Sequence, residues 1–173
     1  MIKKFLIILF SAIVLSTPLF SAGNSSSEIK GQYQVTDSEA RKISNYKLAK
    51  KKILKAKKLE KKGKTDKAKI LYKEAYSRLI EANKENSINP DILNYMGFTS
   101  RKLGNFEDAE IYYLMGLEID PKHVGINEYL GELYVITKRH NLAIERLELL
   151  SDCNCKEYQE LKDVIEGKKV SKY

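Results

Sequence analysis

The sequence predicts an all-α fold in which paired helices repeat along the chain. Gly97 and Gly131 are 34 residues apart, and so are Ala109 and Ala143. A fixed spacing of this length is typical of proteins whose repeated unit is one helical hairpin. The 173 residues include only three prolines and nine glycines, the two residue types that disfavour helices most. Composition and spacing together favour an α-solenoid over a β-rich fold.

The first 23 residues have the layout of a secretory signal peptide. Two lysines precede an almost unbroken apolar run at residues 5–15, and small residues follow it. The run is shorter than the about 20 residues that span a bilayer. We therefore expect export with cleavage after Ala22 or Gly23, and the alternative is an uncleaved segment that tethers the chain to a membrane.

Residues 24–45 are expected to form a flexible linker, because they begin with a polar stretch that has no hydrophobic periodicity. The repeats are expected to occupy residues 46–155, and a capping helix and tail are expected over 156–173. A solenoid needs such a cap because its last apolar face would otherwise be exposed. One side of this final helix is apolar, with Tyr158, Leu161, Val164 and Ile165.

The clearest repeat unit spans residues 90–123 and resembles the tetratricopeptide repeat. The matching positions are Leu93, Met96, Gly97 and Ser100 in the first helix, Gly104 in the turn, and Ala109, Tyr113, Gly116 and Pro121 after it. Leu93 and Ser100 depart from the pattern, because Trp and Tyr are the usual residues there. The resemblance implies two antiparallel helices that approach closely at small residues, namely Gly97, Gly131, Ala109 and Ala143, with Tyr113 and Leu147 filling the gaps.

A second unit at 124–155 keeps Leu130, Gly131, Tyr134, Ala143, Leu147 and Leu150, but has Lys138 at the turn and Cys155 at the closing proline. A weaker unit at about 46–86 repeats the spacing with Gly63, Ala68, Tyr72 and Ala75. Seven additional residues separate this unit from the next, which predicts a second helix extended to about Asn86. Local signals agree, since Asn89–Pro90 and Asn105 are typical of helix starts.

No set of residues has the spacing of a catalytic or metal site. The two histidines, His123 and His140, are expected at a helix start and in a turn. The glycines are isolated, so there is no phosphate-binding loop. The sequence predicts a protein that is not an enzyme, with no cofactor, no metal and no small-molecule substrate.

The two cysteines, Cys153 and Cys155, fall between the last repeat and the cap. In an oxidising compartment they could bond to each other, bond to a partner or remain free. The segment resembles the carboxyl-terminal ends of small exported alphaproteobacterial tetratricopeptide proteins, which have a close cysteine pair followed by Glu and an aromatic residue, here Glu157 and Tyr158.

The net charge of +8 is concentrated near the start of the repeats, where residues 41–69 contain fourteen Lys or Arg and two acids. The candidate basic patch consists of Lys47, Lys50, Lys51, Lys55, Lys57, Lys58, Lys61 and Lys62. It is either a solvated face with ordinary lysine bias or a surface for an acidic protein or an anionic membrane. Nucleic acid is disfavoured as a partner, because export separates the chain from it.

The family resemblance implies that the first helix of each unit lines a concave groove. The candidate partner-binding residues are Asn94, Phe98, Arg101 and Lys102 in the middle unit, Glu128 and Glu132 in the next, and Ile53 and Lys57 in the first. The set lacks the Lys and Asn constellation that clamps C-terminal carboxylates in chaperone-binding relatives.

The sequence thus predicts a periplasmic scaffold or adaptor of the bacterial cell envelope that binds a protein or peptide in its groove. The alternatives are an accessory subunit of an envelope enzyme or secretion complex, and a redox-sensitive helper that uses Cys153 and Cys155. The alternative location is the inner membrane, with the uncleaved signal as the tether.

Overall fold

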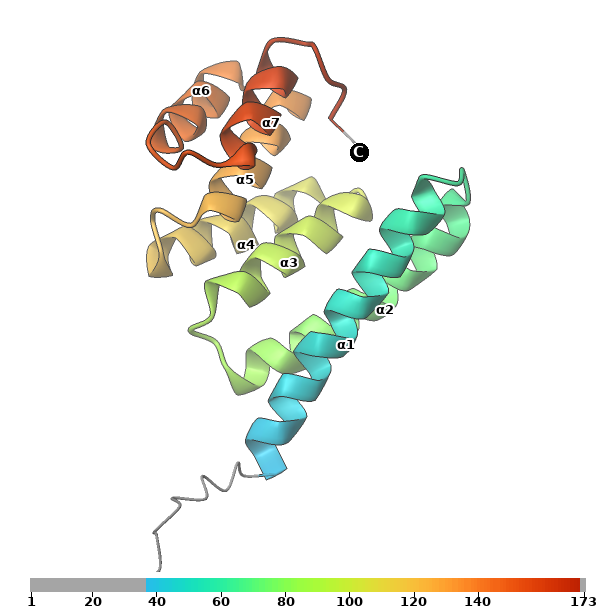
Figure 1. Cartoon of the computed structure of the whole chain (residues 1–173). Helices are drawn as coiled ribbons and strands as arrows, with labels where there is room; N and C mark the ends of the chain where they lie inside the picture. The colour runs from blue at the N-terminus through green and yellow to red at the C-terminus, as the bar shows by residue number, and fades with distance from the viewer. Residues whose placement is uncertain (1–36, 172–173) are drawn as a thin grey trace, which may run out of the picture. The chain divides into compact units, whose positions relative to one another are not determined.

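The computed structural model describes residues 37–171, with side chains from residue 45 onward. The expected signal peptide at 1–23 and the expected linker up to residue 36 lie outside the described residues. The described part contains seven helices and no strand (Figure 1). The helices are α1 (Asp37–Glu60), α2 (Thr65–Glu85), α3 (Pro90–Lys102), α4 (Phe106–Ile119), α5 (Val124–Ile136), α6 (His140–Leu149) and α7 (Lys156–Ile165).

The helices pair into three hairpins, α1–α2, α3–α4 and α5–α6, whose members run side by side in opposite directions (Figure 1). Each hairpin packs on the next through α2 with α3 and α4 with α5, and α7 closes the stack against α5 and α6. The first helices α1, α3 and α5 also contact one another in succession. The expected all-α solenoid of three hairpins and a capping helix is confirmed.

The first hairpin is longer than the other two. Helix α2 ends at Glu85, as the seven additional residues predict. Helix α1 begins at Asp37, so the end of the expected 24–45 linker is helical, and residues 37–44 contain no Gly or Pro that would interrupt a helix. Within the described range, no helix combines the length and the apolar character needed to cross a membrane.

Small residues let the helices of the stack approach closely. A Cβ on Gly97 of α3 would lie 2.5 Å from Cε1 of Tyr113 in α4. A Cβ on Gly131 of α5 would lie 2.6 Å from Cδ2 of Leu161 in the cap, so this glycine serves the contact with α7. Ala109 and Ala143 are fully buried, as expected.

Leu147, which the resemblance places in a gap between helices, is half-buried. Leu150, at the end of α6, is buried. Within α6 only Ala143 is buried, and Leu142 packs against the core from a partly buried position.

The three hairpin turns share one backbone geometry. Gly63, Gly104 and Lys138 all have a positive φ, at 69°, 87° and 61°. Lys138 therefore occupies the left-handed position that glycine takes in the other two turns. At the helix starts, the Asn89 side chain accepts a hydrogen bond from the Ile92 backbone N–H at 3.3 Å. Asn105 stands at the expected N-cap of α4, but its side chain makes no capping hydrogen bond.

Candidate partner-binding surface

The structure places most of the candidate groove residues in the interior. Ile53 and Phe98 belong to the hydrophobic core, each 1% exposed. The polar candidates Asn94, Arg101, Glu128 and Glu132 are also buried, while Lys57 and Lys102 are half-buried. The eight positions therefore do not form an open surface in this structure, because the helices pack closely within each hairpin. Their role in binding a partner stays a prediction.

Two of the candidates, Arg101 and Glu132, form a buried ion pair between α3 and α5. Nη2 of Arg101 lies 3.1 Å from Oε2 of Glu132, and Nη1 of Arg101 donates a hydrogen bond to the Tyr129 backbone carbonyl at 2.8 Å. The hydroxyl of Ser171, beyond the end of α7, donates to the same Glu132 oxygen at 3.3 Å. Glu132 thus links the middle hairpin to the carboxyl-terminal tail.

A second pair connects α1 with α3. Nζ of Lys102 lies 2.9 Å from Oε1 of Glu60, whose other oxygen accepts a hydrogen bond from the Tyr72 hydroxyl at 2.8 Å. Burial lowers the pKa of Lys102, and the hydrogen bond with Glu60 opposes this shift. Burial also raises the pKa of the Tyr72 hydroxyl, and the bond to Glu60 adds to the rise. The Lys102 charge is thus balanced within the protein.

Lys57 stands over two aromatic rings on neighbouring helices. Its ammonium nitrogen lies 4.3 Å from the centroid of the Phe98 ring and 5.8 Å from that of Tyr129. The same nitrogen is 3.4 Å from the Tyr129 hydroxyl oxygen. Cation–π contacts of this kind hold a cation at a partly desolvated site. We call the set that joins α1, α3 and α5 the inner surface; it consists of Lys57, Phe98, Arg101, Lys102, Tyr129 and Glu132.

Tyr129 is the member of the inner surface that the sequence interpretation missed. It contacts Lys57, Arg101 and Phe98, with a ring-centroid distance to Phe98 of 5.3 Å. Burial raises the pKa of its hydroxyl. Tyr95 and Tyr129 are 34 residues apart, which is the repeat spacing, and this signal could have identified the position.

Glu128 lies beside the inner surface, between α5 and the cap. Its pKa is raised to about 9, first by burial, then by a hydrogen bond with Glu160 of α7 and by the negative charge of Glu132. A hydrogen bond between two carboxyl groups requires a proton on one of them. Glu128 is therefore held in its neutral form, and it joins α5 to α7. Asn94 stands apart, near the Gly125 backbone at the start of α5.

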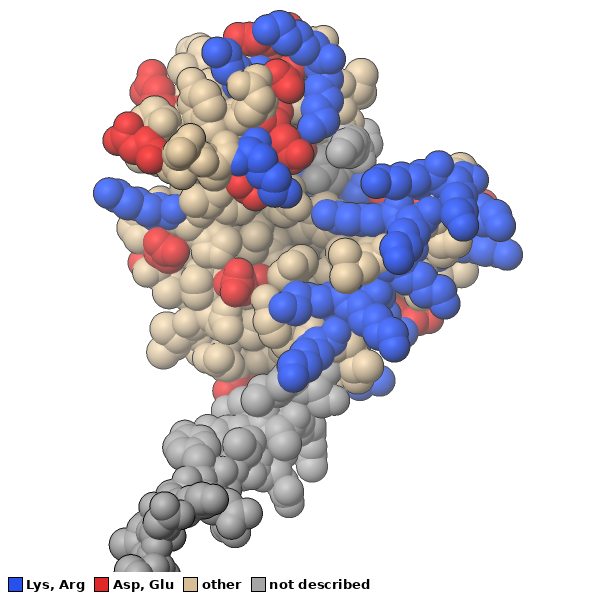
Figure 2. All heavy atoms as spheres, viewed as in Figure 1, with Lys and Arg blue, Asp and Glu red and all other residues tan. Residues whose placement is uncertain are grey.

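The structure divides the candidate basic patch into two groups. Lys50 and Lys57 turn inward, and Lys50 places its ammonium nitrogen 4.5 Å from the Tyr46 ring centroid. The exposed group is Lys47, Lys51, Lys55, Lys58, Lys61 and Lys62. Figure 2 shows lysine side chains gathered over the α1–α2 hairpin, with few acidic residues among them.

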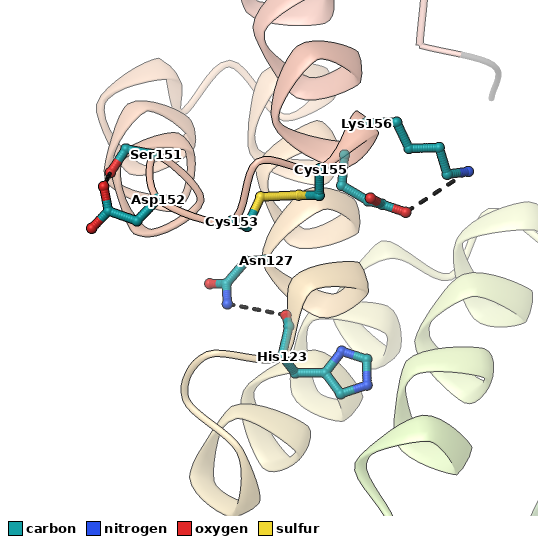
Figure 3. The surroundings of a disulfide bond; sticks show 8 residues. His123, Asn127, Ser151, Asp152, Cys153, Cys155 and Lys156 are labelled. Carbon is teal, nitrogen blue, oxygen red and sulfur yellow. Dashed lines mark hydrogen bonds and ion pairs between the residues drawn. A yellow bond between two sulfur atoms is a disulfide. The ribbon is translucent and has the colours of Figure 1, made fainter.

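Cys153 and Cys155 form a disulfide in the loop between α6 and α7, with their Cα atoms 5.2 Å apart (Figure 3). Both residues are half-buried, and the intervening Asn154 has a φ of 47°. Of the three fates left open by the sequence, the structure contains the bridge between the two cysteines.

Each of the two histidines lies at the start of a helix. Nδ1 of His123 accepts a hydrogen bond from the Ile126 backbone N–H at 3.1 Å and thereby caps α5, while its Nε2 lies 3.2 Å from Asp91. His140 is exposed at the start of α6. Between residues 37 and 171 no group of three His, Cys, Asp or Glu side chains is placed to hold a metal ion.

No protein-family model and no curated protein matches the sequence. Solved structures do match. The second TPR (tetratricopeptide-repeat) domain of human RPAP3, in complex with an HSP70 peptide, has a TM-score of 0.50 at 16% identity and covers 72% of this chain and 98% of that one. The Arabidopsis OM64 TPR domain has a TM-score of 0.47 at 19% identity, covering 72% and 99%. The first TPR of Spaghetti, bound to an HSP90 peptide, has a TM-score of 0.47 at 18% identity, covering 70% and 96%.

Proposed function

We propose that this chain, whose helices have the tetratricopeptide-repeat fold, is a non-catalytic scaffold or adaptor that holds a protein or peptide in the bacterial cell envelope. The inner surface is the observation that carries the proposal. It combines the half-buried Lys57 and the ring of Tyr129 with Lys102, whose side chain is 6% exposed. Aromatic rings and charged hydrogen-bonding groups at a partly desolvated site are the features that anchor protein partners.

The arrangement of the site supports recognition rather than chemistry. Each charged group of the inner surface has an opposite charge or an aromatic ring within contact distance, as in Lys102 with Glu60 and Arg101 with Glu132. Such pairs position donors and rings with little freedom, which lowers the entropy lost when a partner binds. A nucleophile next to a base, the usual mark of a covalent catalyst, is not part of this set.

Two of the structurally similar domains were solved with bound peptides, namely human RPAP3 with an HSP70 peptide and Spaghetti with an HSP90 peptide. These ligands belong to those proteins, and the low identity carries over only the fold. For this chain we therefore propose only the class of ligand, a protein or a peptide. The envelope setting rests on the signal-like residues 1–23 and on the paired cysteines, which suit an oxidising compartment.

Site-specific photo-crosslinking in intact cells tests the proposal. Replacing Tyr129 with p-benzoylphenylalanine keeps an aromatic ring and places a crosslinker on the inner surface. The matched control has the same replacement at Tyr112 of α4, another half-buried tyrosine, whose hydroxyl is 2.7 Å from that of Tyr76. We expect a discrete crosslinked protein at position 129 and not at 112.

The crosslink should also respond to charge. Adding Lys57→Gln and Lys102→Gln to the chain that carries the crosslinker at position 129 should abolish the product, while circular dichroism shows that the helices persist. Two outcomes would count against binding at the inner surface. One is an equal yield of crosslinked product at both positions, and the other is a yield that does not change when both lysines are replaced. Release of the protein by osmotic shock tests the periplasmic location, and retention in the membrane fraction would favour the tethered alternative.

The disulfide favours a second candidate, a redox-sensitive helper or accessory subunit of an envelope complex. Both cysteines are half-buried in the loop next to the cap. If the helper is correct, Cys153→Ser should abolish function in a deletion strain, whereas the Lys57→Gln, Lys102→Gln variant should retain it. The opposite pattern is expected for the adaptor.

A further inference from the structure

One face of α1 carries an array of exposed lysines that the inner surface does not use. Lys47, Lys51, Lys55 and Lys58 recur at intervals of three and four residues, which places them on one side of the helix. All four are exposed, and the exposed Lys61 and Lys62 extend the array into the turn. We call these six lysines, with Leu48 and Leu54, the basic face.

The basic face has few acidic neighbours within the described structure, and Glu74 of α2, which attracts Lys55, is paired with Lys52. None of the six lysines takes part in an ion pair among residues 45–171. The lysines of α1 that have partners turn elsewhere, since Lys52 pairs with Glu74 and Lys57 lies over the inner rings. Glu60, the one acid among the α1 residues whose side chains are described, pairs inward with Lys102.

The closely spaced lysines of the basic face lower the stability of the isolated protein. Like charges three and four residues apart on a helix repel one another and weaken it. The array continues onto the start of α2, where Lys64, Lys67 and Lys69 are exposed and Asp66 is the sole acid of that turn. The lysines therefore concentrate positive charge at this end of the hairpin, as Figure 2 shows, without stabilising the fold through pairing.

Two apolar side chains lie within the array. Leu54 is 62% exposed and stands three residues after Lys51 and four before Lys58. Leu48 is 40% exposed on the same half of the helix. A lysine-rich helical face that exposes leucine is the pattern of helices that lie on a membrane surface, where the leucine enters the headgroup region.

We propose that the basic face binds the surface of an anionic phospholipid bilayer. From the rise of an α-helix, the array extends about 16 Å along α1 from Lys47 to Lys58. It contains Lys rather than Arg throughout. Lysine acts as a point charge with flexible donors, so it does not need the fixed bidentate geometry that favours Arg, and laterally mobile headgroup phosphates can neutralise it. The contact is independent of the inner surface.

A tryptophan reporter tests the proposal in the full chain, which contains no tryptophan of its own. Leu54→Trp places the fluorophore on the basic face. Ile111→Trp, at an exposed position of α4, is the matched control. Vesicles of phosphatidylglycerol containing brominated lipid should shift the emission of the Leu54→Trp chain to shorter wavelength and quench it, and should leave the emission of the Ile111→Trp chain unchanged. Purely zwitterionic vesicles should affect neither reporter.

Charge removal completes the experiment. Changing Lys47, Lys51, Lys55 and Lys58 to Gln in the Leu54→Trp chain should lower the vesicle partition coefficient at least about tenfold, since each lysine near an anionic surface contributes to binding. The control changes the same number of exposed lysines elsewhere, Lys84, Lys122, Lys138 and Lys156, and should lower it less than about threefold.

Three results would overturn the proposal. These are equal quenching of the two reporters, equal effects of the two lysine sets, and an emission shift with poly-glutamate but not with phosphatidylglycerol vesicles. The last result would assign the basic face to an acidic protein.

Discussion

Arg101 of α3 and Glu132 of α5 form an ion pair whose side chains are 0% and 9% exposed, although 31 residues separate them in the sequence. The pair joins the second and third hairpins at the centre of the inner surface. Removing two charges from water is costly, and their mutual attraction offsets that cost only while both are present. Removing one partner should therefore destabilise the protein more than replacing both partners with apolar residues.

Glu132→Gln should destabilise the protein by about 3 kcal/mol, because it leaves the buried Arg101 charge without its counterion. Urea unfolding followed by circular dichroism measures the change. The double variant Arg101→Met, Glu132→Leu should lose less than the single one, since it removes both charges and keeps similar volumes. A single variant within about 0.5 kcal/mol of the parent, the range of neutral surface changes, would show that the pair is not desolvated in solution.

Gly97→Ala should destabilise the protein by about 1 kcal/mol. Alanine is the better helix former by about 1 kcal/mol, but the added Cβ would come within 2.8 Å of three ring atoms of the fully buried Tyr113. Overpacking a core of this kind costs about 1–3 kcal/mol, so the clash should outweigh the propensity. In a double-mutant cycle with Tyr113→Leu, the two losses should be less than additive. Full additivity would argue against the close contact.

Lys138→Gly should stabilise the protein by about 0.5–1 kcal/mol, because only glycine adopts the left-handed backbone without strain. The matched change in the opposite direction is Gly104→Ala, at the same position of the preceding turn, and it should destabilise by a similar amount. Thermal unfolding of the two variants checks both signs. A loss of stability in Lys138→Gly would indicate that the lysine side chain supports the turn.

Stability should fall as pH rises above about 4.5, because Glu128 has a pKa raised to about 9 in the folded protein. The folded state then binds more protons than the unfolded state between these two values, so the free energy of unfolding decreases with pH across that window. The contribution is fully present below pH 4.5 and is lost as pH passes 9. One proton corresponds to a slope of up to about 1.4 kcal/mol per pH unit.

Glu128→Gln should flatten this pH dependence and raise the melting temperature at pH 8, since the neutral amide mimics the protonated acid. The measurement is thermal unfolding at pH 5, 7 and 8. Glu118→Gln, on the exposed side of α4, serves as the control and should leave the slope as it is. If the parent protein shows the same stability at pH 5 and 8, the hydrogen bond between Glu128 and Glu160 does not persist in solution.

Much of the fold could be predicted from spacing along the chain. The 34-residue recurrence identified the hairpins, and the seven additional residues after Ala68 identified the long α2. The missing turn glycine at Lys138 marked a position that does have a positive φ. These features depend on contacts between residues close in sequence, so a local pattern contains the information.

The candidate site was less predictable. Family resemblance nominated Phe98 and Ile53 as groove residues, and the structure buries both. It did not nominate Tyr129, which contacts Lys57, Arg101 and Phe98. Exposure at such positions depends on how far one hairpin rotates against the next, and that rotation arises from side-chain packing across the whole interface.

The sequence by itself determined the all-α repeat architecture, the turn positions and the concentration of lysine in the first hairpin, because each follows from residue type at a fixed local spacing. Only the tertiary structure decided which lysines turn inward and which form the basic face, and that Arg101 meets Glu132. Those outcomes depend on contacts between helices far apart in the chain. Such contacts follow from the packing of whole helix faces, which no short stretch of sequence specifies.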